Sequence, residues 1–369
     1  MATTKNSALA GAGITGTGIS RRRLLAAGGI AAVAGPILAA CSSSSSSPTA
    51  AASGSSTGVP ALGALNYQLS WVKNVEFAGS YIADTKGYYK AQGFSSVNLI
   101  AGGSASTGAE TVVSAGKALV GVSSPDITSA AIVKGAPLKI VGAQYQKNPF
   151  AIMSLAKTPI ATPEDMYGKK IGVQVANASV WDTFIKAAKL DVSKIDVVTV
   201  QFDPTPLTQG AVDGWFSFIT NEPNELAVEG FKTTTFLLAD FGYPLVSETY
   251  LTTTDSISSN PEAVKAFLLG EIKGWKDNIA DPALGATLTV NTYGKGLGLT
   301  IAEQTLESKA ENAIIQSADT AKNGLFTVTD ALIEENIKTL AIGGTTITAA
   351  ELFDFSILEE IYKENPSLI

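Results

Sequence analysis

The feature of this sequence that most constrains its fold is a regular alternation of short apolar runs with helical patterns. Runs such as 65–72 and 138–143 have the length and the apolar content of buried strands, whereas residues 76–92 show the spacing of an amphipathic helix that stops at Gly93. Strands that alternate with helices favour a mostly parallel sheet with helices on both faces. We therefore expect an α/β protein.

The alternation falls into two series followed by a helical tail. The first series runs to about residue 155 and the second from 156 to 247. After Tyr243 a strand at 248–253 precedes long helical segments, which we expect at 261–278, 282–293, 301–316, 329–340 and 349–365. A late strand and a helical tail indicate that the chain returns to its first lobe. We predict one lobe from 61–155 with 248–369, and a second from 156–247.

The N-terminal segment carries an export pattern. Arg21, Arg22 and Arg23 precede an apolar run from 24 to 40, and Leu38-Ala39-Ala40-Cys41 then leads into a run of serines. A basic start, an apolar stretch and small residues at a cut are the layout of a secretory signal. The tetrad resembles a bacterial lipobox, which implies that Cys41 is lipidated after cleavage. A membrane-spanning helix is disfavoured because the run is shorter than ~20 residues and contains glycine and proline.

These motifs predict how the N-terminal part is used. We expect residues 1–40 to be a signal peptide and 41–60 to be the lipidated cysteine with a flexible linker. The protein would then be exported and lipid-anchored on the extracytoplasmic face of the cell membrane. Residues 20–25 also resemble the twin-arginine signature, so the choice between that route and general secretion stays open.

Composition argues against catalysis. The chain has no histidine and its only cysteine is Cys41, which excludes Ser-His-Asp and Cys-His nucleophile pairs and most zinc sites. We expect no catalytic residues, no metal and no cofactor. After the predicted signal peptide, the chain has 33 acidic residues and 22 basic ones. Such a surface repels phosphate backbones, so nucleic acid is not an expected partner.

Two motifs resemble a known family. Trp71 followed by Asn74-Val75-Glu76-Phe77, and the turn from Lys86 to Phe94, are similar to the opening of NMT1/THI5-like solute-binding proteins of ABC importers. Further similar segments extend the resemblance over about residues 65–280. The family's relatives bind sulfonates, nitrate, pyrimidine precursors of thiamine, or riboflavin.

The resemblance implies a type II periplasmic-binding fold, in which two α/β lobes are joined by two crossover strands and the ligand lies between them. It also implies a monomer that captures a small planar solute and delivers it to an ABC permease with its ATPase subunit, without being an enzyme. A sulfonate- or nitrate-type anion site is the alternative, although no arginine follows Arg23. A THI5-like pyrimidine synthase and an interaction protein that has lost its ligand are the other classes.

Candidate ligand-binding residues follow the ends of the predicted strands, where α/β proteins gather ligands. Aromatic rings there can stack on a flat solute, and amides and carboxylates can read its polar groups. Several have an alternative structural role: Asn74 and Ser124 as helix caps, and the larger aromatics as core. The candidates are Trp71, Asn74, Glu76, Phe77, Ser104, Ser124, Gln144, Asn177, Trp181, Trp215, Asn221, Glu222 and Tyr243.

Overall fold

The computed structural model describes residues 59–103 and 105–369. The predictions for Cys41, the signal peptide, most of the linker and Ser104 therefore lie outside the described residues. Among the described helices, none combines the length and the apolar character that a membrane span needs.

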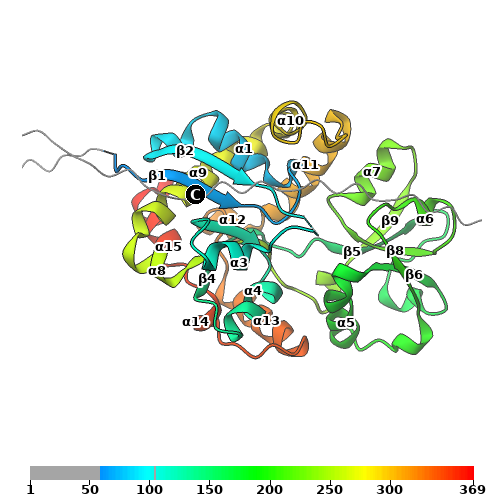
Figure 1. Cartoon of the computed structure of the whole chain (residues 1–369). Helices are drawn as coiled ribbons and strands as arrows, with labels where there is room; N and C mark the ends of the chain where they lie inside the picture. The colour runs from blue at the N-terminus through cyan, green and yellow to red at the C-terminus, as the bar shows by residue number, and fades with distance from the viewer. Residues whose placement is uncertain (1–58, 104) are drawn as a thin grey trace, which may run out of the picture. The chain divides into compact units, whose positions relative to one another are not determined.

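Ten strands form two five-stranded sheets in the described part of the chain. The first sheet contains β1 (Gly63–Gln68), β2 (Phe94–Ile100), β3 (Val120–Ser123), β4 (Leu138–Tyr145) and β10 (Ser247–Thr253). The second contains β5 (Phe150–Leu155), β6 (Lys170–Gln174), β7 (Asp196–Val200), β8 (Gly214–Phe218) and β9 (Thr233–Leu237). Figure 1 shows β5 leading away from the first sheet toward β6, β8 and β9.

The two sheets share one topology. Their strand orders are β2-β1-β3-β10-β4 and β7-β6-β8-β5-β9. In the first sheet β1 is parallel to β2 and β3, while β10 is antiparallel to β3 and β4. In the second sheet β6 is parallel to β7 and β8, while β5 is antiparallel to β8 and β9. Each sheet thus holds one antiparallel strand, β10 in the first and β5 in the second, and the chain crosses between the sheets before each of them. This confirms the predicted type II arrangement.

Strand β5 differs from its predicted place. We expected residues 150–155 in the first lobe, but β5 pairs with β8 and β9 in the second sheet. The first crossing therefore lies at residues 146–149. A short apolar run has no feature that tells which of two sheets it joins, because that depends on long-range pairing. Strand β10 joins the first sheet as predicted, and the exact domain limits stay a prediction.

Within residues 59–103 and 105–369, fifteen α-helices and seven single turns connect and cover the strands. The helices are α1 (Ala78–Thr85), α2 (Tyr88–Ala91), α3 (Ala109–Ser114), α4 (Pro125–Val133), α5 (Ala178–Ala187), α6 (Thr205–Thr208), α7 (Glu222–Val228), α8 (Thr254–Ser259), α9 (Pro261–Ala280), α10 (Pro282–Leu288), α11 (Ile301–Ile315), α12 (Ala318–Asn323), α13 (Asp330–Ile342), α14 (Ala349–Leu352) and α15 (Ser356–Glu364). The turns are η1 (Val75–Phe77), η2 (Pro163–Met166), η3 (Val175–Asn177), η4 (Val192–Lys194), η5 (Leu238–Phe241), η6 (Thr289–Tyr293) and η7 (Pro366–Leu368).

Two predicted helices are interrupted in the structure. The segment predicted at 76–92 is divided into η1, α1 and α2, and Gly87 between the helices has a φ of 73°. Glycine adopts this left-handed conformation without steric cost, which explains the break. The segment predicted at 349–365 is divided into α14 and α15 because Phe353 forms a β-bridge with Ile140.

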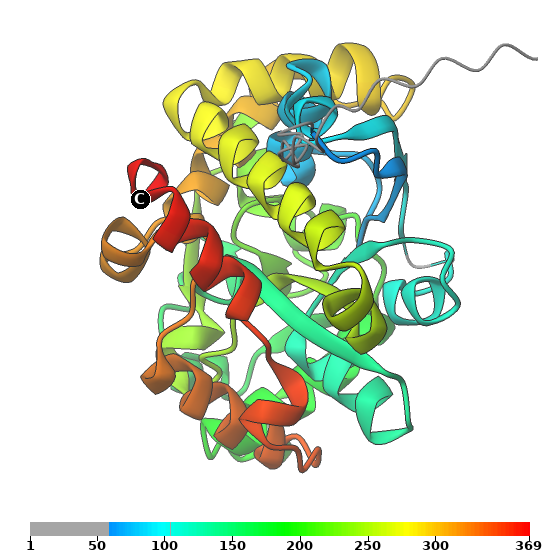
Figure 2. The same cartoon turned by 90° about the vertical axis from the view of Figure 1, so that its left-hand side faces the viewer.

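Close packing of α1 against α9 fixes the start of α1, next to the site described below. A Cβ on Gly79 would lie 2.3 Å from the Trp275 ring, and a Cβ on Gly274 would lie 2.0 Å from the Gly79 carbonyl oxygen. Both positions therefore need glycine for the helices to approach this closely. Figure 2 shows α9 in yellow-green with the red α15 beside it, and the two helices are in contact.

Candidate functional site

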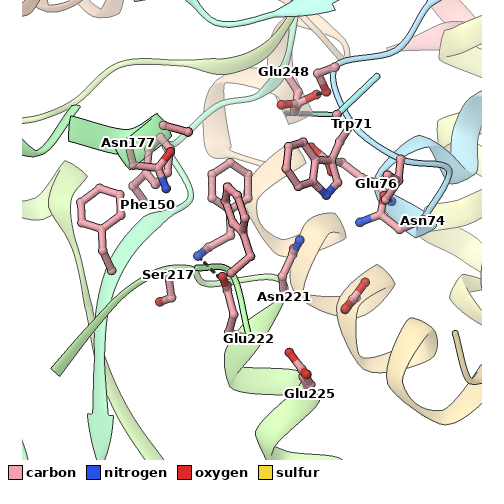
Figure 3. A pocket seen from close by; sticks show the side chains of 18 of the residues that line it. Trp71, Asn74, Glu76, Phe150, Asn177, Ser217, Asn221, Glu222, Glu225 and Glu248 are labelled. Atoms are coloured by element: carbon pink, nitrogen blue, oxygen red, sulfur yellow. Dashed lines mark hydrogen bonds between the residues drawn. The ribbon is translucent and has the colours of Figure 1, made fainter. Parts of the chain in front are cut away.

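A cavity of about 450 Å³ is lined by residues from both sheets. Its walls are the loop after β1, the end of β8 with α7, residues at β5, β10 and η3, and the first turns of α11. Figure 3 shows labelled side chains from both sheets gathered around it. The lining residues are Ser70, Trp71, Val72, Asn74, Glu76, Gly103, Ile127, Phe150, Ala176, Asn177, Phe202, Phe216, Ser217, Phe218, Asn221, Glu222, Glu225, Glu248, Leu299, Glu303, Gln304 and Glu307.

The loop after β1 supplies both an aromatic and a polar wall. Trp71 lies 5.2 Å from Phe202, measured between ring centroids, with the ring planes tilted by 58°. Phe202 follows β7 and is 37% exposed, so this pair connects the first sheet's loop to the second sheet's loop. Asn74 caps η1, and its Oδ1 accepts a hydrogen bond from the Glu76 backbone N–H at 3.3 Å. The capping role considered for Asn74 and its place in the cavity wall are therefore both observed.

Glu76 and Glu248 form a buried carboxyl pair. They are 3% and 5% exposed, and the Ser70 hydroxyl donates to Glu248 Oε2 at 2.7 Å. Burial, together with the nearby Glu248 charge, holds the pKa of Glu76 well above its ordinary value. Burial likewise raises the pKa of Glu248 to about 7. The pair therefore retains a proton at neutral pH.

The backbone at Glu248 is unusual. Its φ is 45°, inside a strand, and non-glycine residues seldom adopt this left-handed conformation. Such strain costs about 1–3 kcal/mol and persists where surrounding structure enforces it. Here the paired neighbours of β10 on both sides, β3 and β4, hold the strand in place.

Helix α7 and β8 form the opposite wall. The Phe218 backbone N–H donates to Glu222 Oε2 at 2.9 Å, which fixes the Glu222 carboxylate at the helix start. Burial raises the pKa of Glu222 to about 7. Burial and the nearby Glu303 charge raise the pKa of Glu225 to about 7 as well. Phe150 packs edge-on against Phe218 with centroids 4.7 Å apart and supplies an apolar surface.

Helix α11 supplies a wall that the sequence analysis did not identify. Gln304 Oε1 accepts from the Val75 backbone N–H at 2.8 Å, which joins α11 to η1. Gln304 Nε2 donates to Glu307 Oε2 at 2.7 Å. Glu303 and Glu307 are one helical turn apart, a spacing that puts both on one face. Their i,i+4 spacing was visible in the sequence, but nothing local indicated which face of this helix meets a cavity.

Six of the predicted residues line the cavity: Trp71, Asn74, Glu76, Asn177, Asn221 and Glu222. Phe77 belongs to the core of the first sheet, and Trp181, Trp215 and Tyr243 lie in cores at the second. These four positions followed strand ends or flanked strands, but their side chains pack inward, as the core alternative allowed.

Two further predicted residues lie outside the lining. Ser124 takes the N-cap position of α4 without a side-chain capping bond, and its hydroxyl donates to Asp126 Oδ1 at 2.5 Å. Gln144 is buried and donates to the Glu76 backbone oxygen at 3.0 Å, while its Oε1 accepts from the Tyr250 hydroxyl at 3.2 Å. Gln144 thus holds η1 in position. Ser104 lies outside the described residues.

The charge of the cavity is one-sided. Six of the lining residues are glutamates, and the lining contains no lysine or arginine. No ion pair in the described chain includes any of these six carboxylates. Asn177 adds an amide, whose Nδ2 donates to Gln174 Oε1 at 3.0 Å. The cavity therefore offers aromatic faces, amides and an excess of hydrogen-bond acceptors.

Two five-stranded sheets joined by two crossings of the chain, with a cavity lined from both, define the fold of periplasmic binding proteins, and comparison with solved structures agrees. The aliphatic sulphonate binding protein SsuA of Escherichia coli matches with a TM-score of 0.57 and 15% identity over 76% of this chain and 86% of that one. The nitrate-binding protein NrtA of Synechocystis PCC 6803 matches with a TM-score of 0.55 and 13% identity over 82% and 89%. At these identities the likeness concerns the fold.

The chain belongs to the NMT1/THI5-like family, whose model matches residues 74–284. The predicted resemblance is thereby confirmed. Among curated proteins, the riboflavin-binding protein RibY of Chloroflexus aurantiacus is 26% identical over 235 residues. This match covers 60% of the present chain and 64% of that relative, less than two thirds of its length.

Proposed function

We propose that this protein is the substrate-binding subunit of an ABC importer and captures a small planar solute in the cavity. The observation that carries the proposal is the lining itself, with aromatic rings, amides and carboxylates contributed by both sheets. A solute held by both lobes stabilises their closed arrangement, which is how such proteins couple binding to recognition by a partner. Family membership and the named solute-binding neighbours support the same function.

The solute would be flat and heteroaromatic, of a pyrimidine, thiamine-precursor or flavin type. Trp71 and Phe202 meet across the cavity, and Phe150 provides a third ring, so a planar solute finds stacking surfaces from both lobes. We further propose that the protein acts as a monomer and passes its solute to a membrane permease driven by an ATPase. The extracytoplasmic location proposed for this chain agrees with the periplasmic proteins of the same fold.

A sulfonate- or nitrate-type anion is the second candidate, because proteins of this fold with those ligands are among the neighbours. The charge of the lining opposes it. An oxyanion is normally bound by arginine, lysine or several backbone N–H groups, whereas this cavity has six glutamates and no basic side chain in its lining. Bringing an anion here would add charge repulsion to the desolvation cost.

A solute screen tests the function. We expect the purified protein to gain thermal stability with at least one pyrimidine, flavin or related heterocycle and to bind it without consuming it. Calorimetric titration then gives a stoichiometry and an affinity. Turnover of the ligand would revive the synthase alternative, and a complete absence of binding to heterocycles, sulfonates and nitrate would contradict the importer role.

A further inference from the structure

Six glutamates from separate parts of the fold face the same cavity. Glu76 comes from η1 and Glu248 from β10, while Glu222 and Glu225 come from α7, and Glu303 and Glu307 come from α11. Packing brings these carboxylates together although they are distant in sequence. Like charges at this density oppose folding unless protons or a counter-ion neutralise them.

One of these carboxylates has an unused acceptor in the cavity wall. Glu307 is 4% exposed and lines the cavity. Gln304 donates to its Oε2 at 2.7 Å, and within the described residues no donor is hydrogen-bonded to its Oε1. This oxygen is not among the fully enclosed atoms without a partner, so it reaches accessible space from a largely buried side chain. A ligand that donates a hydrogen bond from the cavity can satisfy it.

We propose that the solute is an organic cation with a flat aromatic body, such as an aromatic amidine or amine. This inference rests on the function proposed above, because it assigns a chemical class to the solute of that same cavity. A planar cation would place its ring against Trp71, Phe202 or Phe150, and its N–H groups toward the glutamates. The face of an aromatic ring attracts a cation and also stacks on a flat ring. The aromatic walls and the glutamate walls therefore favour the same ligand.

A metal ion fits the arrangement less well than an organic cation. Among the described residues, no group of three or more histidine, cysteine, aspartate or glutamate side chains is placed to hold a metal. The six carboxylates are instead distributed around a cavity of about 450 Å³. A distributed negative lining matches a cation whose positive charge is spread over several atoms.

Protons could neutralise the glutamate charges in place of a cationic ligand. The two explanations differ in whether binding releases protons. Burial raises the pKa of Glu248 and of Glu222 to about 7, so these carboxyl groups are partly protonated near neutral pH. A bound cation would favour the charged carboxylates and expel protons, whereas a neutral solute would leave them. The titratable groups that interact electrostatically at this cavity are the six lining glutamates together with Asp203, Glu229, Glu311, Tyr81 and Tyr145.

Matched probes of one shape and different charge test the proposal. Benzamidine and 2-naphthamidine are flat cations, 2-naphthamide is a neutral isostere, and 2-naphthoate is the anion. We expect a naphthamidine or benzamidine dissociation constant at least about tenfold below that of naphthamide, with naphthoate weakest. The reason is that charge-assisted hydrogen bonds are roughly twice as strong as neutral ones. Titrations in buffers of different ionisation enthalpy should report net proton release with the amidine alone.

The double variant Glu225→Gln/Glu303→Gln locates the effect. No side-chain hydrogen bond in the described chain depends on either carboxylate, so the variant removes charge with little structural loss. We expect it to weaken amidine binding about tenfold more than it weakens naphthamide binding. Glu359→Gln, at an exposed glutamate of α15, is the matched control and should change neither.

The outcomes separate this inference from the importer function. A neutral or anionic solute that binds more tightly than every cation overturns the charge assignment and leaves the importer function standing. Equal amidine affinity in the double variant and the wild-type protein also overturns it. If no solute of any charge binds, both the function and the charge assignment are wrong.

Discussion

The pair of Glu76 and Glu248 makes a specific prediction about stability and pH. The pKa of Glu248 rises from an ordinary 4.5 to about 7 in the folded protein because the carboxyl is buried. The unfolded chain therefore loses this proton near pH 4.5, while the folded chain keeps it until about pH 7. The stabilisation that protonated Glu248 provides is complete below the unfolded-state pKa of 4.5. It is lost as the pH rises to the folded-state pKa of about 7.

The size of the effect follows from the same difference. Each tenfold change in proton affinity corresponds to about 1.4 kcal/mol, so Glu248 alone lowers the free energy of unfolding by about 3 kcal/mol between pH 4.5 and pH 8. Glu248→Gln removes this ionisation and can keep the hydrogen bond from Ser70. We expect the variant to gain about 2–3 kcal/mol over the wild-type protein at pH 8, relative to their difference at pH 4.5.

Urea unfolding at several pH values and constant ionic strength measures this gain. Glu359→Gln, with its exposed side chain, serves as the control and should follow the wild-type profile. If Glu248→Gln and the wild-type protein lose stability in parallel from pH 4.5 to pH 8, then Glu248 does not carry an elevated pKa and the reasoning about the buried pair is wrong.

Three further substitutions test other parts of the structure. Trp71→Ala should weaken solute binding about tenfold, with unfolding little changed because Trp71 is only half-buried beside Phe202; unchanged affinity in a calorimetric titration would remove this ring from the site. Gly274→Ala should destabilise the protein by about 1–3 kcal/mol in urea unfolding, since its Cβ would overlap the Gly79 oxygen. If the variant is as stable as the wild-type protein, α1 and α9 can move apart at little cost in free energy. Cys41→Ser should release the protein from the membrane fraction of expressing cells, and retention there would refute the lipid anchor.

Much of the fold could be predicted from the sequence because the patterns of strands and helices are local. Alternating strands and helices gave the α/β class, and the late strand at 248–253 predicted the return of the chain, which β10 confirms. Strand β5 was assigned to the wrong sheet since pairing partners lie far along the chain: Phe150 pairs with Phe218, and Leu155 with Thr233. Local pattern does not determine such contacts.

The cavity was most predictable in the loops that follow strands. Trp71 lies three residues beyond the end of β1 and Asn221 three beyond the end of β8, and both line the cavity. Trp215 and Tyr243 looked similar in sequence, yet both are fully buried in cores, since aromatic residues serve packing as readily as binding. Glu303 and Glu307 were missed because only tertiary packing brings the start of α11 to the cavity.

The two crossings of the chain between the sheets have a mechanical consequence. The chain passes between the sheets at 146–149 and again at 238–246, and these segments join strands that are neighbours at both ends: β4 lies beside β10, and β5 beside β9. Two adjacent tethers define a pivot line, so rotation about it is the relative motion that costs least. For the function proposed above, a substitution that stiffens either tether would shift the balance between open and closed forms, and hence the affinity, while no atom in contact with the solute changes.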